Sequence, residues 1–301
     1  MPDHATDIER HRAAYRSTMV SVVVNIVLST AQLIIGVLAQ SQALVADAIH
    51  SFSDLVSDGV VLLANKHSAR GPDRGHPYGH HRFETAASLV IGALLIAVGI
   101  GMLWRSGASL QEPGAIPQVH STALVIALIT LVSKELLFRY QLAIGKRYRS
   151  TLLIANAWHS RSDAISSLVV VIGISCNLAG FALADPIAAL IVGLFIIRMG
   201  WKFFISAFND LVDAAADAET EHRIRTHLLG TPGVLGIHAF RTRKMGDFVW
   251  VEVDLEMDGS LTIEQGHAIA AEARQRVMVH EPVLEVTTHF DPVAIPKCKK
   301  Q

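Results

Sequence analysis

Charged residues are scarce in this chain of 301 residues. Asp, Glu, Lys and Arg together make up 18% of it, whereas a soluble domain has about 25%. The two signs nearly cancel, to a formal net charge of -1, so no overall basic field indicates a nucleic-acid partner. The mean hydropathy is +0.38, and the apolar residues gather in long runs. These features predict a membrane protein.

Cysteine is almost absent. Cys176 and Cys298 lie far apart and match no zinc-finger or redox spacing, so we expect no disulfide framework. We expect no cleavable signal either, because the first apolar run is too long for one and follows an acidic stretch. The sequence contains no His-Glu-x-x-His or Gly-x-Ser-x-Gly motif, which argues against a membrane metalloenzyme.

Long apolar runs fill the first two thirds of the chain, up to about residue 208. Each is long enough to cross a bilayer, which needs roughly 20 apolar residues. They lie near 17–38, 42–65, 84–106, 120–143, 152–179 and 185–208. The sequence therefore predicts an α-helical membrane domain of six transmembrane helices over 1–208.

From residue 209 to 301 the pattern becomes that of a small soluble domain. Charged helical stretches alternate there with runs of alternating polar and apolar residues. Their order is a helix at 217–229, strands at 234–244 and 248–258, a helix at 262–279 and a strand at 283–290. This order predicts an α+β domain of the αββαβ type.

Basic residues mark one side of the predicted membrane domain. Lysine and arginine in short loops usually face the cytoplasm, and three segments on the same predicted side carry nearly all of them. These residues are Arg10, Arg12 and Arg16 before the first span, Lys66, Arg70, Arg74 and Arg82 after the second, and Arg139, Lys146, Arg147 and Arg149 around the fourth-to-fifth connection. We therefore expect both termini in the cytoplasm.

Two predicted spans carry the same His-x-x-x-Asp spacing. His50 and Asp54 lie in the second span, and His159 and Asp163 lie in the fifth. The spacing puts each pair on one helix face, although a carboxylate at the bilayer centre costs about 2.5–3.5 kcal/mol. If the two helices face each other, two imidazoles and two carboxylates form a site that suits tetrahedral Zn²⁺. Other divalent first-row ions also fit.

A structural interpretation of the same polar residues stays open, because His–Asp pairs can also join helices or line a water-filled cavity. Asp47, three residues before His50, is expected to support packing or the ligands rather than to bind metal. Lys134 and Glu135 are expected to form a structural pair. Ordinary hydrogen bonds between helices are expected from Asn25, Gln32, Ser53 and Ser57.

Several motifs give the chain a resemblance to a known family. The run Ser41–Ala48 (SQALVADA) leads into His50 and Asp54, His-Pro-Tyr-Gly-His follows at 76–80, and His159-x-x-x-Asp163 lies in the fifth span. Together with the six spans and the C-terminal domain, these motifs resemble the cation diffusion facilitator family. The resemblance covers nearly the whole chain and is strongest to bacterial zinc and ferrous-iron efflux pumps.

The resemblance implies a homodimer in the bacterial inner membrane that exchanges cytoplasmic divalent metal for protons. It implies that His50, Asp54, His159 and Asp163 form the transport site and that the C-terminal domain is metallochaperone-like and joins the dimer. Some bacterial members have Asp in place of His50. The form with two His and two Asp resembles the zinc-preferring type and leaves Fe²⁺, Cd²⁺ and Co²⁺ as alternatives.

Two further groups of metal ligands are implied outside the membrane. Asp73, His76 and His80 match a three-ligand loop site of bacterial members, and Gly75 and Pro77 favour a turn that gathers them. A solvated loop that only packs is the alternative. A binuclear site near the dimer interface is implied at His238, Asp254, His267, His289 and Asp291. Asp254 stands where close relatives often have His, which puts the affinity or selectivity of one metal in doubt.

Arg82 and Asp213 match a charge pair that joins the membrane and soluble parts in related pumps. The sequence thus predicts a proton-coupled exporter of divalent metal, Zn²⁺ first, with Zn²⁺ also as a structural or regulatory ion. A membrane metalloenzyme is the second hypothesis, and a membrane-anchored metal sensor is the third. The sensor predicts spans without ionisable residues, and these spans contain several.

Overall fold

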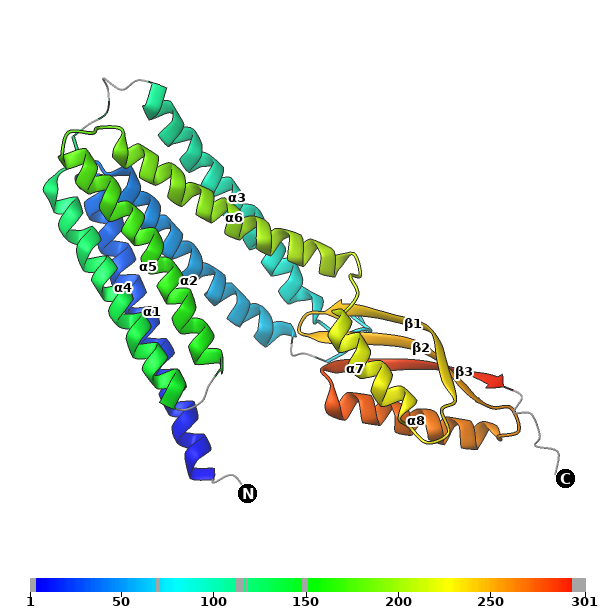
Figure 1. Ribbon diagram of the computed structural model, residues 1–301. Coiled ribbons are helices and arrows are strands. Elements are labelled where there is room, and N and C mark those ends of the chain that lie inside the picture. The colour runs from blue at the N-terminus through cyan, green and yellow to red at the C-terminus, as the bar shows by residue number, and fades with distance from the viewer. Residues whose placement is uncertain (1–3, 69–70, 112–115, 117, 148–150, 294–301) are drawn as a thin grey trace. The chain divides into compact units, whose positions relative to one another are not determined.

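Six long helices make up the first part of the chain. The computed structural model describes residues 4–68, 71–111, 116, 118–147 and 151–293. Figure 1 shows the helices running along one another. They are α1 (His4–Leu38), α2 (Gln42–Ser68), α3 (Arg82–Gln111), α4 (Ser121–Arg147), α5 (Thr151–Leu178) and α6 (Ala184–Leu211).

Five helices among the described residues are long and apolar enough to cross a membrane. They are Tyr15–Leu38 within α1, all of α3 and α4, Asn156–Leu178 within α5, and α6. The remaining predicted span is α2, a helix of 27 residues that carries Asp47 and Asp54. Its crossing of the membrane stays a prediction, whereas the other helices show a multi-pass membrane protein.

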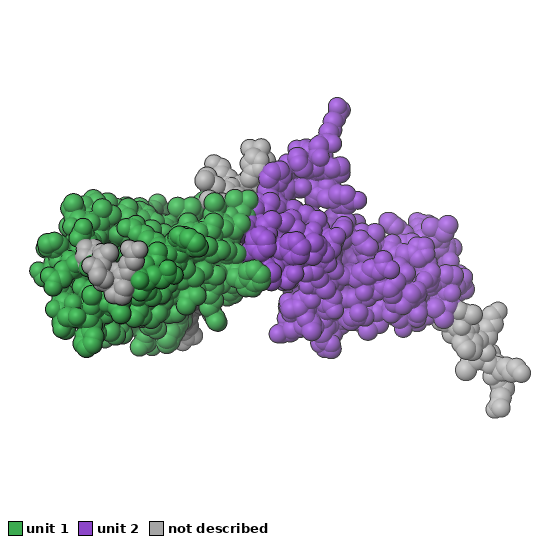
Figure 2. Space-filling model, turned by 90° about the horizontal axis from the view of Figure 1, so that it is seen from above, with its two compact units in different colours: residues 1–60, 90–203 green, residues 61–89, 204–301 purple. Residues whose placement is uncertain are grey.

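The described chain separates into two compact units, coloured in Figure 2. Unit 1 contains residues 1–60 and 90–203, and unit 2 contains 61–89 and 204–301. Unit 2 therefore includes the loop after α2 and the first turns of α3 along with the C-terminal strands and helices.

Unit 1 exposes apolar side chains and buries polar ones. Val23, Leu94 and Ile172 are exposed, whereas Gln32 and Gln141 are fully buried. This distribution reverses that of a soluble protein and fits a domain whose outer surface meets lipid. The core consists largely of small and branched residues, including Ala43, Ala46, Ala123, Val170, Ala188 and Val192.

One end of unit 1 is tied together by hydrogen bonds between helices. The buried Asp185, near the start of α6, accepts bonds from Ser41 Oγ at 2.5 Å and from the backbone N–H of Gln42 at 2.7 Å. At the same end, the N–H of His120 donates to Ala39 O at 3.1 Å. Asp185 thus satisfies backbone N–H groups at the start of α2, which that helix cannot pair by itself.

The C-terminal part of unit 2 has the predicted αββαβ order. Its elements are α7 (Ala218–Leu229), β1 (Gly236–Met245), β2 (Phe248–Asp258), α8 (Ile263–His280) and β3 (Val283–Val293). β2 is the central strand; it pairs with β1 in antiparallel fashion and with β3 in parallel fashion. The predicted fold class is therefore confirmed for this domain, with β3 longer than expected.

Both helices of this domain cover the same face of the sheet (Figure 1). On β2, Val251, Val253 and Leu255 are buried beneath them, together with Ile224 and Leu228 of α7. The alternating β2 residues point to the other face. That open face is free to carry polar ligands.

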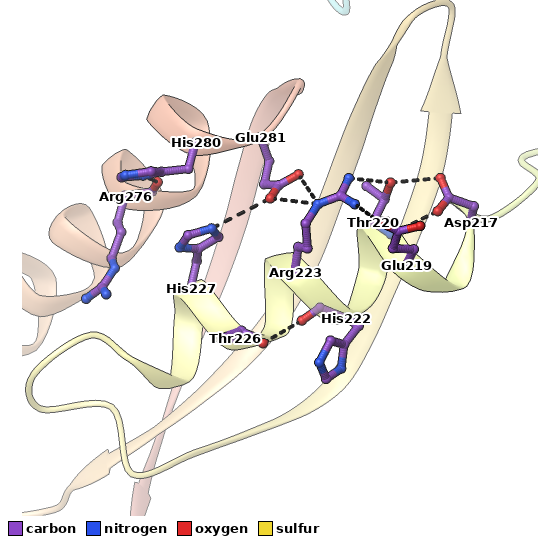
Figure 3. A network of polar contacts seen from close by, with 10 residues as sticks. All are labelled: Asp217, Glu219, Thr220, His222, Arg223, Thr226, His227, Arg276, His280 and Glu281. Atoms are coloured by element: carbon purple, nitrogen blue, oxygen red, sulfur yellow. Dashed lines mark hydrogen bonds and ion pairs between the residues drawn. The ribbon is translucent and has the colours of Figure 1, made fainter.

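The buried carboxylate of Glu281, just after α8, contacts two side chains of α7, as Figure 3 shows. Arg223 Nε lies 3.0 Å from both oxygens of Glu281, and His227 Nε2 lies 3.6 Å from Glu281 Oε1. The rings of His227 and His280 stack with their centroids 4.9 Å apart. These two histidines therefore belong to a packed network.

Candidate metal sites

The His-x-x-x-Asp motifs of α2 and α5 come together inside unit 1. Single ligand atoms of His50, Asp54 and Asp163 all lie within 4.8 Å of one another. Within α2, His50 Nδ1 lies 3.9 Å from Asp54 Oδ2. His50 is buried, and its Nδ1 has no hydrogen-bond partner among the described residues. A buried polar atom without such a bond suits a metal ligand, because leaving it unpaired costs free energy.

His159 lies at the margin of this group. Its Nε2 is 3.9 Å from Asp163 Oδ2, and half of its side chain is exposed. Among the described residues, the compact group contains His50, Asp54 and Asp163 without His159. The structure thus brings three of the predicted ligands together and places the fourth next to one of them. Their joint role as a transport site stays a prediction.

Asp47 is fully buried and makes no part of that group. Gln32 Nε2 donates to its Oδ2 at 2.6 Å, and Ser167 Oγ donates to the same oxygen at 2.8 Å. Lys134 Nζ lies 3.7 Å from that oxygen. The predicted pairing of Lys134 with Glu135 is therefore wrong, because neighbouring residues on a helix point in different directions.

Two serines predicted to bridge helices bond within their own helix. Ser53 Oγ donates to Ile49 O at 2.7 Å, and Ser57 Oγ donates to Ser53 O at 2.8 Å. Hydroxyl groups on a helix commonly bond the carbonyl one turn earlier. Gln32, in contrast, makes the expected bond between helices.

The loop after α2 gathers its three predicted ligands. Asp73, His76 and His80 offer ligand atoms within 4.8 Å of one another. His76 Nδ1 lies 3.4 Å from Asp73 Oδ1, and His80 Nε2 lies 3.4 Å from Asp73 Oδ2. His80 is buried, whereas the other two side chains are about half exposed. A set of one carboxylate and two imidazoles can hold Zn²⁺.

Hydrogen bonds of the backbone hold this loop in shape. The Asp73 carboxylate accepts from the N–H of His76 at 2.7 Å and of Gly75 at 2.8 Å. These bonds, that from His76 first, lower the pKa of Asp73, so the carboxylate is ionised at neutral pH as a metal ligand must be. Gly79 adopts φ 83, a conformation that favours glycine.

The open face of the C-terminal sheet carries a third group. His238 on β1, Asp254 on β2 and Asp291 on β3 offer ligand atoms within 4.8 Å of one another. His238 Nε2 lies 2.8 Å from Asp291 Oδ2 and 3.7 Å from Asp254 Oδ2. Strand register explains the meeting, because His238 pairs with Asp254 and Asp291 pairs with the next outward residue of β2, Glu256.

Glu256 is a polar neighbour that the sequence analysis missed. Its Oε1 lies 3.3 Å from His238 Nδ1. Its position two residues after Asp254, on the same strand face, is the signal that could have revealed it. His289 lies beside this group, with Nε2 3.4 Å from Asp291 Oδ1. His267 lies on α8 and outside the compact group, so the predicted set of five is only partly assembled in one chain.

The expected charge pair of unit 2 forms. An Arg82 guanidinium nitrogen donates to Asp213 Oδ1, and Arg82 Nε lies 3.3 Å from Met245 Sδ. Arg243 Nη1 is 4.0 Å from the same carboxylate. Because Arg82 and Asp213 are both substantially exposed, we assign the pair a small role in stability.

These observations define a multi-pass membrane protein equipped with three groups of His and Asp side chains suited to divalent metal. One group lies in the membrane unit, one in the loop after α2 and one on the open face of the C-terminal sheet.

The chain belongs to the cation efflux, or cation diffusion facilitator, family. Residues 18–212 match the cation efflux transmembrane domain, and 216–293 match the cation efflux protein cytoplasmic domain. Members of this family are transporters and not enzymes. The family resemblance read from the sequence is thus confirmed.

Several relatives resemble the chain over most of its length. Metal tolerance protein C1 of Arabidopsis thaliana is 36% identical over 280 residues, which are 88% of this chain and 59% of that protein. The manganese efflux system protein MneP of Bacillus subtilis is 30% identical over 295 residues, covering 94% of this chain and 99% of that protein. The metal-bound C-terminal domain of the CzcD transporter from Thermotoga maritima matches 26% of this chain and 93% of its own, at 24% identity and a TM-score of 0.25.

Proposed function

We propose that the protein exports a divalent metal ion, Zn²⁺ first, from the cytoplasm in exchange for protons. The observation that carries this proposal is the group of His50, Asp54 and Asp163 inside an otherwise lipid-facing unit. Ionisable groups at membrane depth are expensive and generally mark an ion path. We propose that His159 completes the site by turning its partly exposed ring toward Asp163.

The donor set also supplies the proton coupling. A metal binds neutral imidazole and ionised carboxylate, so protons leave the site when the ion enters. Protons arriving from the opposite side of the membrane then compete with the metal for the same atoms. An unperturbed imidazole titrates near pH 6.5, within the range that a proton gradient spans.

The choice of Zn²⁺ rests on ligand type. Two imidazoles and two carboxylates suit tetrahedral Zn²⁺, and His50 supplies one of the imidazoles. Fe²⁺, Cd²⁺ and Co²⁺ are the alternatives, and the relative named for manganese efflux adds Mn²⁺. Affinity alone separates these ions poorly, so a transport assay has to decide.

We further propose a homodimer in the bacterial inner membrane with both termini in the cytoplasm. The basic loops support this orientation. The loop group and the sheet group would then face the cytoplasm, where Zn²⁺ bound to them can report the metal level. Residues for these roles are Asp73, His76 and His80 in the loop, and His238, Asp254, His267, His289 and Asp291 in the C-terminal domain.

Proteoliposomes that carry a pH gradient test the main proposal. Zn²⁺ entry and internal pH are recorded together with dyes, and Fe²⁺, Mn²⁺, Cd²⁺ and Co²⁺ are offered in competition. We expect Asp54→Ala and Asp163→Ala to abolish both signals. Glu135→Gln is the matched control, because Glu135 lies on α4 in a partly exposed pair with Arg139.

Coupled flux that survives Asp163→Ala contradicts the assigned site. A protein that binds Zn²⁺ without any flux supports the sensor hypothesis instead. The relative rates of the five ions then fix the metal that the site prefers.

A further inference from the structure

Asp47 and Lys134 form a buried ion pair that the proposed transport chemistry does not use. Their side chains are 0% and 3% exposed, and Lys134 Nζ lies 3.7 Å from Asp47 Oδ2. Two charges without solvent are costly, and attraction between them offsets that cost only when further hydrogen bonds satisfy the remaining atoms. An ion pair buried in this way indicates a role beyond packing.

The surrounding side chains supply those hydrogen bonds from several helices. Asp47 accepts from Gln32 of α1 at 2.6 Å and from Ser166 and Ser167 of α5 at 3.1 and 2.8 Å. Lys134 of α4 donates to Ser51 of α2 at 3.1 Å and to Ser167 at 3.0 Å. The pair and its partners thus connect α1, α2, α4 and α5.

This network lies one helical turn from the proposed ligands on both helices. Asp47 precedes His50 by three residues on α2, and Ser166 follows Asp163 by three on α5. Ser166 Oγ also lies within hydrogen-bonding distance of Asp163 O, at 2.8 Å.

We propose that Asp47 is a positioning residue of the transport site and that Lys134 is its fixed counter-ion. Asp47 holds α2 against α5 and so sets the spacing of His50 and Asp163. Lys134 cancels the extra negative charge that this anchor brings close to the ion. The inference rests on the proposed function of the site. It adds that the Asp47–Lys134 pair tunes the affinity of that site for the metal ion.

The charges around the site predict opposite effects on metal binding when Asp47 or Lys134 is neutralised. A divalent ion between Asp54 and Asp163 is already neutralised, and the Asp47–Lys134 pair adds no net charge. Replacing Lys134 with a neutral residue leaves one extra negative charge, which strengthens metal binding and slows release. Replacing Asp47 leaves one extra positive charge, which repels the ion. In a medium of low effective dielectric constant each change should reach about tenfold.

Zn²⁺ flux in proteoliposomes tests this with the full chain. For Lys134→Met we expect KM and kcat to fall about tenfold, and for Asp47→Asn we expect KM to rise about tenfold. The double variant Asp47→Asn/Lys134→Met should return KM to within about threefold of the unaltered protein. Glu135→Gln, on the same helix, should leave both constants unchanged.

A purely structural pair predicts something different. Damage to packing raises KM in both single variants, so shifts of equal sign in two folded variants overturn the inference. If Lys134→Met does not fold, Lys134→Gln replaces it. Ser167→Ala, which removes a bond from each partner and no charge, should move KM less than either charge change. A larger shift in Ser167→Ala also counts against the inference.

The outcome for the unaltered protein separates this inference from the proposed function. If it transports Zn²⁺ and the KM shifts share a sign, only the inference fails. If it binds Zn²⁺ through His50 without flux, the transport proposal fails. The inference is then tested on the dissociation constant for Zn²⁺, which should fall in Lys134→Met and rise in Asp47→Asn. If it binds no Zn²⁺ at this site, both fail.

Discussion

Removing the carboxylate of Asp185 should loosen the end of unit 1 at which α2 begins. Asp185 Oδ1 accepts from Ser41 Oγ at 2.5 Å, and Oδ2 accepts from the N–H of Gln42 at 2.7 Å. A third contact, from Ala43 N at 3.4 Å, is too long to add much. Asp185→Ala leaves one buried donor, Ser41 Oγ, and one partly buried donor, the N–H of Gln42, without their acceptor.

The size of the effect follows from these bonds. A buried donor left unpaired costs about 1–3 kcal/mol, and bonds to charged groups lie at the upper end. Water that enters the loosened end recovers part of this cost, so we expect a net loss of about 2–4 kcal/mol. Since about 1.4 kcal/mol is a factor of ten, the population with this end open should rise at least about tenfold.

Thiol labelling measures this population. Ala43 is fully buried, so the probe is Ala43→Cys in a background without Cys176 and Cys298. Its labelling rate follows the open fraction. Ser109→Ala is the matched control, because it removes only neutral bonds: the one from Gln42 Nε2 to Ser109 Oγ and the one from Ser109 Oγ to Arg105 O within α3. An unchanged rate in folded Asp185→Ala would refute the reasoning that this carboxylate closes the end.

Three further predictions concern the C-terminal domain. Glu281→Gln should lower the free energy of unfolding by about 1–3 kcal/mol, because Arg223 loses a charged acceptor. Thermal unfolding of the full chain measures the loss, and an unchanged midpoint contradicts this prediction. Leu255→Ala should cost about 2–5 kcal/mol, since Leu255 is fully buried, and a denaturant titration with a smaller loss would count against that packing. Hydrogen bonds from Thr220 lower the pKa of Asp217, so its stabilising contribution is present above the ordinary carboxyl pKa and is lost as the pH falls below it. Asp217→Asn should therefore flatten the acid limb of the stability profile, and an identical profile rules this out.

Local sequence patterns predicted most of the fold. Strict alternation identified β2 with its observed bounds, and apolar length found the helices of the membrane unit to within a few residues at most ends. The beginning of α1 at His4 was missed because hydropathy does not detect the polar turns before a span. β3 continues through Pro292 to Val293, which its place at the sheet edge permits.

The candidate sites were predictable where the ligands share a helix or a loop. Helical spacing paired His50 with Asp54, and the turn residues gathered Asp73 with His76 and His80. Contacts between distant helices were not predictable in this way. Lys134 meets Asp47 across the helix bundle, and periodicity contains no information on which helices are neighbours.

The strand order of the C-terminal domain has a consequence for biosynthesis. His238 and Asp254 are synthesised before Asp291, and they are paired in the hairpin of β1 and β2. Asp291 joins them only after α8 has crossed the sheet and β3 has paired with β2 in parallel. A chain interrupted before that point holds two of the three side chains. The three side chains of this group therefore come together only in chains that include Asp291 and a paired β3. If the group binds Zn²⁺, we expect a Zn²⁺-dependent gain in protease resistance of this domain only in such chains.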